Sequence, residues 1–181
     1  MKNNGQNSKK RTVARSLALV GIMAATAECG KLALSFLPNV EVVTLLLALY
    51  GYVFGGLGVA AAFVFVSIEP LIWGFNTWVV SYYLYWPLVA LVFMILSKFK
   101  IKNCVIIASS AVLLTFFFGI LTALIDVGLL SGAFDNFAYR FGIYYARGIV
   151  FYIVQTVSNA VIFMLLFPFV RDRLEKIKKR L

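Results

Sequence analysis

The sequence contains no histidine, two cysteines and seven acidic residues among its 181 positions. Histidine is the usual general base near neutral pH and the commonest transition-metal ligand, so its absence excludes Ser-His-Asp catalysis and histidine-ligated zinc or haem. Two cysteines are too few for a thiolate metal site. We therefore expect no metal and no other cofactor. Many enzyme classes are excluded as well, and the leading interpretation is a protein without enzymatic activity.

Charged residues are also scarce, at 13% of the chain, whereas hydrophobic residues make up 62%. A soluble domain of this size could not bury that much apolar surface, so the sequence predicts an integral membrane protein. Four apolar runs are long enough to cross a hydrocarbon core of about 30 Å. They cover residues 16–37, 78–97, 105–130 and 144–170.

A fifth apolar region, 40–73, is interrupted by the glycine-rich stretch "GYVFGGLG" at 51–58. Glycines clustered in this way disfavour one continuous helix, so we interpret the region as two short spans joined by a turn. A re-entrant hairpin is the alternative. The expected fold is thus all-α, one membrane domain over residues 1–181 with six transmembrane helices.

Most of the 17 basic residues lie in three clusters, at 2–15, 98–102 and 171–180. Six spans place all three clusters on one side of the membrane, and the positive-inside rule makes that side cytoplasmic. We therefore expect a basic cytoplasmic N-terminus at 1–12 and a basic cytoplasmic tail at 171–181. The expected location is a bacterial plasma membrane, with lipid and not nucleic acid as the partner of these charges.

The N-terminus also resembles a cleavable signal peptide, because basic residues precede an apolar stretch that ends near Met23. Glu28 beside Cys29 does not fit a lipoprotein signal. We expect an uncleaved first helix.

The remaining charged residues fall in the outer half of the membrane or in outer loops. A charge near the bilayer centre costs about 2.5–3.5 kcal/mol, so such residues face a partner or a water-filled cavity. Glu28 and Lys31 are spaced to pair with each other on one helix. The others have no local partner at helical spacing, which favours an interhelical ion pair or a ligand contact. They include Glu69, Asp126 and Arg147.

Aromatic residues gather on the same side, in "WGFNTWVVSYYLYWP" at 73–87. An interfacial belt accounts for Trp73 and Trp78, but Trp86 lies about two turns deeper and fits a belt poorly. Gln155 and Asn159 are either helix-packing contacts or ligand contacts. Carboxylates, amides, an arginine and rings together suit a planar or conjugated solute of mixed charge.

The first apolar run carries a stripe of small residues at intervals of three and four. Its members are Ala14, Ala18, Gly21, Ala25 and Cys29. Small residues let another helix approach closely, either within the protein's own bundle or from an outside partner. The stripe faces away from Glu28, which leaves room for an outside partner.

In these features the chain resembles the S components, the substrate-binding membrane subunits of energy-coupling-factor vitamin transporters. The resemblance covers nearly the whole chain. It rests on the basic termini, on "GIMAA" at 21–25 and on "PNVEVVTLLLALYGYVFGGLGVAAAF" from Pro38. It implies a receptor that captures a micronutrient at the extracellular face and works with a transmembrane coupling subunit and two cytoplasmic ATPases.

The resemblance also implies roles for individual residues. Gly21 and Ala25 stand at the positions of the family's docking motif for the coupling subunit, with glycine in place of the usual first alanine. With Ala18 they form the expected partner interface. The segment 38–41 matches the loop that closes over the ligand, so Glu41 is either a lid residue or a solvated loop charge. The candidate substrate-binding residues are Asn39, Glu41, Glu69, Trp86, Asp126, Arg147, Gln155 and Asn159.

The sequence indicates the family more clearly than it indicates the ligand. The absence of histidine argues against the nickel and cobalt carriers of the family. Aromatic and polar residues spread over four helices suggest a wide site, for which the expected substrate is a corrinoid of the cobalamin type. Two other functions stay open: an intramembrane enzyme that works without histidine, and a structural or regulatory bundle.

Overall fold

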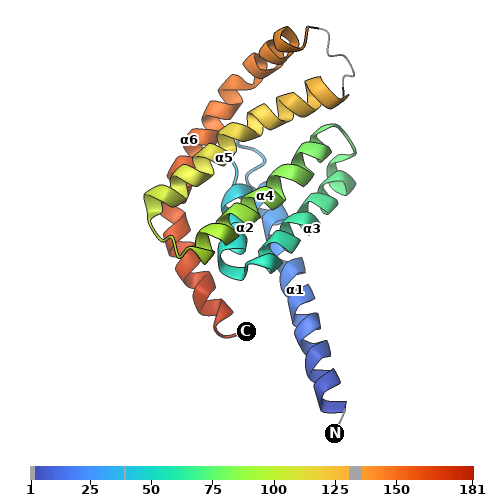
Figure 1. Ribbon diagram of the computed structural model, residues 1–181, viewed down its shortest axis with the longest axis vertical. Coiled ribbons are helices and arrows are strands. Elements are labelled where there is room, and N and C mark those ends of the chain that lie inside the picture. The colour runs from blue at the N-terminus through green and yellow to red at the C-terminus, as the bar shows by residue number, and fades with distance from the viewer. Residues whose placement is uncertain (1–2, 39, 131–135) are drawn as a thin grey trace.

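The computed structural model describes residues 3–38, 40–130 and 136–181, and all the regular structure in these ranges is helical. An all-α fold was expected and is confirmed. The elements are α1 (Asn3–Ala33), α2 (Val43–Phe54), α3 (Gly56–Trp73), α4 (Trp78–Lys98), α5 (Cys104–Leu124), the π-helical η1 (Ile125–Leu130) and α6 (Phe137–Lys178), arranged as Figure 1 shows.

Five of these helices are long and apolar enough to cross a membrane, as expected for a multi-pass membrane protein. The exception is α2, whose 12 residues extend for about 18 Å, less than the hydrocarbon thickness of about 30 Å. Most residues of α2 are buried, and the helix packs against α3, α4 and α6. The region expected to form two short spans therefore forms one helix of spanning length and one short, enclosed helix.

The break between α2 and α3 lies at Gly55, whose φ of 62° is in the left-handed region that favours glycine. The chain then folds back, and α3 packs against α2. A Cβ atom on Gly58 would stand 2.2 Å from the carbonyl carbon of Tyr50, so only glycine permits this approach. The predicted break at the glycine-rich stretch is confirmed, with a junction of one residue in place of a longer turn.

The helix ends differ from the apolar runs at both termini. Helix α1 ends at Ala33, and residues 34–37 form turns through backbone hydrogen bonds such as Leu37 N–H to the Leu34 carbonyl, at 2.9 Å. Helix α6 has 42 residues and continues through Lys178, so most of the segment expected as a basic tail is helical. The segment expected as a basic N-terminus is also helical from Asn3.

Three hydrogen bonds bring distant basic and connecting segments together at one end of the molecule. Arg15 Nη1 donates to the Leu181 carbonyl at 3.0 Å, and Lys178 Nζ donates to the Val53 carbonyl at 2.5 Å. The hydroxyl of Tyr52 donates to the carbonyl of residue 101 at 2.9 Å. One end of the molecule thus holds both terminal helix ends, the α2–α3 junction and the α4–α5 connection. The α3–α4 connection lies at the other end (Figure 1).

The core surrounds α2 and is closed by aromatic rings from α4 and α6. The rings of Phe93, Phe163 and Phe167 contact one another with centroid separations of 5.5–5.6 Å, and all three are fully buried. Within a membrane such packing stabilises helix association through van der Waals contact, because lipid tails are as apolar as the side chains. This core holds α2 and α4 in place beneath the pocket described next.

Candidate ligand-binding site

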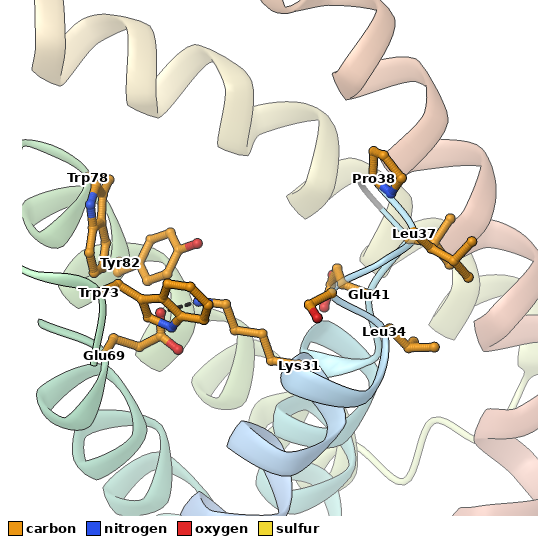
Figure 2. Close-up of a pocket in the computed structure, with 11 residues that line it drawn as sticks. Lys31, Leu34, Leu37, Pro38, Glu41, Glu69, Trp73, Trp78 and Tyr82 are labelled. Carbon is orange, nitrogen blue, oxygen red and sulfur yellow. Dashed lines mark hydrogen bonds and ion pairs between the residues drawn. The ribbon is translucent and has the colours of Figure 1, made fainter. Parts of the chain in front are cut away.

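A pocket of about 410 Å³ opens where the end of α1, the α1–α2 connection, the end of α3 and the start of α4 meet (Figure 2). It is lined by Lys31, Leu34, Ser35, Leu37, Pro38, Val40, Glu41, Glu69, Trp73, Trp78 and Tyr82. Sixteen residues of helix, about 24 Å, separate Lys31 from Arg15 at the basic end of the molecule. The pocket therefore lies toward the end that carries the α3–α4 connection.

An ion pair between Lys31 of α1 and Glu69 of α3 forms the polar centre of the pocket. The two residues are 38 positions apart, and the Glu69 side chain is fully buried. The sequence also allowed Lys31 to pair with Glu28, one turn away on the same helix. In the structure the pair is interhelical, because the lysine side chain reaches across to α3 (Figure 2).

Two aromatic rings lie beside the same lysine. The Lys31 ammonium is 5.4 Å from the ring centroid of Trp73 and 5.4 Å from that of Tyr82. An ammonium within about 6 Å of a ring centroid is attracted to the negative face of the ring. The cation is thus held by one carboxylate and two rings, drawn together in Figure 2.

A second carboxyl group, that of Glu28, lies next to this ion pair. Glu28 is 7% exposed, and its side chain faces Glu69 and the Trp73 ring. Within the described ranges neither Glu28 oxygen has a hydrogen-bond partner, and neither has Oε1 of Glu69. Because burying a carboxyl group without donors is costly, these three oxygens are left ready to accept hydrogen bonds.

A third carboxylate, Glu41, fixes the α1–α2 connection. It accepts the backbone N–H of Thr44 at 2.9 Å and the hydroxyl of the same residue. Asn159 of α6 donates through Nδ2 to Glu41 at 3.3 Å and to the hydroxyl oxygen of Thr115 on α5 at 3.0 Å. Since Asn159 and Thr115 are fully buried, this network joins α6 and α5 to the wall of the pocket.

The opposite wall is an aromatic row on one face of α4. The rings of Trp78 and Tyr82 are 4.8 Å apart, and those of Tyr82 and Trp86 are 5.6 Å apart, both in edge-to-face contact. Trp86 is 4% exposed and lies behind Tyr82, one turn further from the pocket. Edge-to-face contact is a preferred arrangement of aromatic rings, so these contacts orient Trp78 and Tyr82 along the pocket wall.

Four of the sequence candidates belong to this region. Glu41 and Glu69 line the pocket, Asn159 contacts Glu41 from behind, and Trp86 supports Tyr82. The structure thus brings these four together, although two of them act on the pocket only through a neighbour.

The other four candidates lie apart from the pocket lining or outside the described residues. Asp126, in η1, accepts the hydroxyl of Tyr144 of α6. Arg147 is exposed on α6 and does not line the pocket. Gln155 is buried on α6 about one turn before Asn159. Asn39 lies outside the described residues.

Pattern reasoning missed four lining residues that carry polar or aromatic chemistry: Lys31, Trp73, Trp78 and Tyr82. Lys31 was assigned to a local pair, and the two tryptophans were assigned to an interfacial belt. One signal was available, since only four residues separate Trp73 from Trp78. A connection that short keeps the end of α3 and the start of α4 adjacent, and hence both rings at the same site.

The predicted partner interface lies on the outer face of α1. Ala18, Gly21 and Ala25 are all exposed, and a Cβ atom on Gly21 would meet nothing within 4 Å. The opposite face of the helix is buried through residues such as Met23 and Ala27. Ala18, Gly21 and Ala25 therefore lie on the side of α1 that faces away from its buried face.

Chemically, the pocket lining combines two carboxyl groups, one ammonium and three aromatic rings, and the carboxyl group of Glu28 lies directly behind it. In the described part of the chain, no group of three or more histidine, cysteine, aspartate or glutamate side chains is arranged to hold a metal ion. Such a pocket can pair charges and stack on a flat solute. No family model, curated protein or solved structure matches the chain.

Proposed function

We propose that this chain is the substrate-capturing subunit of an ATP-driven importer, an S component of the energy-coupling-factor type, and that it binds a small vitamin-like solute. The observation that carries the proposal is the pocket lined by Lys31, Glu69 and three aromatic rings at one end of a membrane bundle. Rings and paired charges at a concave site are how proteins hold flat polar metabolites.

Sidedness supports capture from outside the cell. The basic segments converge at the end opposite the α3–α4 connection, and basic segments are retained in the cytoplasm. In that orientation the pocket faces the exterior. A bacterial plasma membrane is the compartment in which this arrangement would serve uptake.

The volume of the pocket limits the size of the ligand. Small-molecule sites are typically about 300–1,000 Å³, and 410 Å³ is in the lower part of that range. A solute with one or two rings fits this volume, whereas a corrinoid with its macrocycle and nucleotide arm exceeds it. We therefore favour a small vitamin over the corrinoid expected above.

The α1–α2 connection is the proposed lid. It contributes Pro38 and Glu41 to the pocket wall, and it is tethered through Glu41 to Thr44 and Asn159. The hydrogen bonds of Glu41 fix one end of the connection, and the other end consists of short turns. The connection can therefore close over a solute while its Glu41 end stays in place.

The exposed stripe on α1 supports the proposed partner. Ala18, Gly21 and Ala25 offer a flat surface on which a helix of a coupling subunit can dock closely, and that subunit would be driven by two cytoplasmic ATPases. This chain would then bind and release its ligand without catalysing a reaction.

One observation favours a second candidate function. Glu28 and Glu69 place two buried carboxyl groups side by side, the minimum for acid–base catalysis without histidine. In a hydrolase the Glu28→Gln variant would lose turnover, whereas in a receptor the same variant would change only ligand affinity.

The test is a thermal-shift panel of vitamins on the purified protein. A ligand at a hundred times its Kd adds about 2.7 kcal/mol to the free energy of unfolding, a readily measured rise in melting temperature. Glu69→Gln should abolish the shift. Asp126→Asn, which changes a carboxyl away from the pocket lining, should preserve it. A protein that no vitamin stabilises would refute the receptor function.

A further inference from the structure

The charges around the pocket are unbalanced. Glu41 and Glu69 line it and Glu28 lies directly behind, whereas Lys31 is the one cation among the described lining residues. An excess of carboxyl groups at a concave site attracts cations and repels anions. The charge of the pocket therefore bears on which solutes it admits.

The carboxyl oxygens also lack donors. Glu69 is fully buried, lines the pocket and uses one oxygen for Lys31, while its Oε1 has no partner within the described ranges. Glu28 is 7% exposed, and its carboxyl group lies close to Glu69 and to the Trp73 side chain, although neither of its oxygens has a partner at hydrogen-bond geometry within the described ranges. Buried carboxylates are normally satisfied, so a ligand that brings N–H groups would complete this site.

The position of the Lys31 ammonium has the form of a cation-binding cage. One carboxylate and two ring faces surround it, with both ring centroids 5.4 Å away. Aromatic cages beside a carboxylate are used to recognise ammonium and other organic cations. Here the cage is filled by a side chain of the protein itself.

Lys31 is well placed to leave the cage. Its side chain is 26% exposed, and it belongs to the last turn of α1, immediately before the turns at 34–37. A lysine has a long flexible stem, so its ammonium can move to the pocket mouth without a change in the helix. Figure 2 shows the stem crossing the pocket from α1 to Glu69.

We infer that Lys31 is an internal stand-in for the ligand, and that the pocket accepts a solute whose ammonium, amidinium or protonated ring nitrogen displaces the Lys31 ammonium from Glu69, Trp73 and Tyr82. This inference rests on the proposed function and adds the charge class of the solute. In the complex the ligand cation pairs with Glu69, its N–H groups reach the free carboxyl oxygens, and its ring stacks on the α4 row.

The two charge classes predict opposite effects of removing Lys31. A cationic solute competes with the lysine, so Lys31→Met should strengthen its binding. An anionic solute needs the lysine as its only counter-charge, so the same change should abolish its binding. A neutral solute that hydrogen-bonds to the ammonium should also bind more weakly.

The test uses generic probes of the pocket's size on the intact protein: benzylammonium, the protonated form of benzylamine, as the aromatic cation with N–H donors, and phenylacetate as the anion. Binding is followed by tryptophan fluorescence, because Trp73 and Trp78 line the pocket. We expect the cation to bind Lys31→Met roughly tenfold more tightly than the wild type, from the loss of a competing cation–π and ion-pair partner. Lys31→Arg, which keeps the competing charge, should bind the cation no more tightly than the wild type.

Two further outcomes bear on the inference. Glu69→Gln should lose the cation, which would support it, provided size-exclusion chromatography shows the variant to be folded. Equal affinity of the cation for Lys31→Met and the wild type would overturn it, as would phenylacetate binding that depends on Lys31. A vitamin panel that fails altogether refutes the proposed function, whereas a neutral or anionic vitamin that needs Lys31 refutes only this inference.

Discussion

Gly51 of α2 lies against the backbone of Ala90 on α4, and replacing it by alanine tests the packing beneath the pocket. A Cβ atom at this position would stand 2.0 Å from the carbonyl oxygen of Ala90 and 2.7 Å from the carbonyl carbon of the same residue. Ordinary contacts begin at 3.4 Å. Because the obstacle is backbone, no rotamer change can relieve the clash, and the two helices must separate or rotate.

The magnitude follows from two opposing contributions. Replacing glycine by alanine within a helix stabilises it by roughly 0.5–1 kcal/mol. Overpacking a filled interior costs about 1–3 kcal/mol and occasionally more, and a backbone clash of this depth belongs at the upper end. The net loss should be about 2 kcal/mol, which for a chain of this length corresponds to a fall in melting temperature of roughly 4–8 °C.

Gly21→Ala is the matched control, since it makes the same change in a helix at a position with nothing within 4 Å. Both variants are purified in the same detergent and unfolded by heating without ligand, with intrinsic tryptophan fluorescence as the readout. Gly51→Ala should melt below the wild type and Gly21→Ala at or slightly above it. A Gly51→Ala protein as stable as the control would show that α2 and α4 do not approach as described.

Four further variants test other parts of the molecule. Asn159→Leu removes the donor to Glu41 and Thr115. It should lower the free energy of unfolding by about 1–3 kcal/mol in a denaturation measurement. A stability equal to that of the wild type would count against the buried network. Gly21→Leu or Ala25→Leu should abolish vitamin uptake by cells yet leave the ligand-induced thermal shift of the purified protein intact. Loss of that shift would show that the small residues pack inside this chain's own bundle. Arg147→Ala should leave ligand affinity unchanged because the side chain is exposed on α6, and weakened binding would bring this helix into the site.

The helices were largely predictable from the sequence, because apolar runs and glycine clusters report directly on membrane spans and their breaks. The ends of the terminal helices were not. Hydropathy marks only the part of α6 that suits lipid, whereas lysine, arginine and glutamate are good helix formers and continue the helix to Lys178. Similarly, nothing in the apolar run ending at Leu37 marks Ala33 as the last helical residue.

The site was predictable in depth but not in lateral position. Counting residues from the basic boundary places Lys31, Glu69 and Arg147 in the same outer layer, because each turn of helix advances along the membrane normal by a known amount. It does not say which helices are neighbours or how each is rotated. Lys31 and Glu69, 38 positions apart, form an ion pair, while Arg147 at a similar expected depth is exposed on α6.

The lateral position of each helix is decided by close backbone contacts, and the pattern of charged and polar residues in the sequence does not reveal them. The close approach of α2 to α4 at Gly51 and of α3 to α2 at Gly58 fixes how α3 and α4 lie around the short central helix. That placement brings Glu69 and Tyr82 to the same side of the pocket, within reach of Lys31. Because this packing positions the pocket, Gly58→Ala should weaken ligand binding as well as stability, although Gly58 does not line the pocket. Full affinity in a destabilised Gly58→Ala protein would show instead that the pocket is held by its own polar contacts.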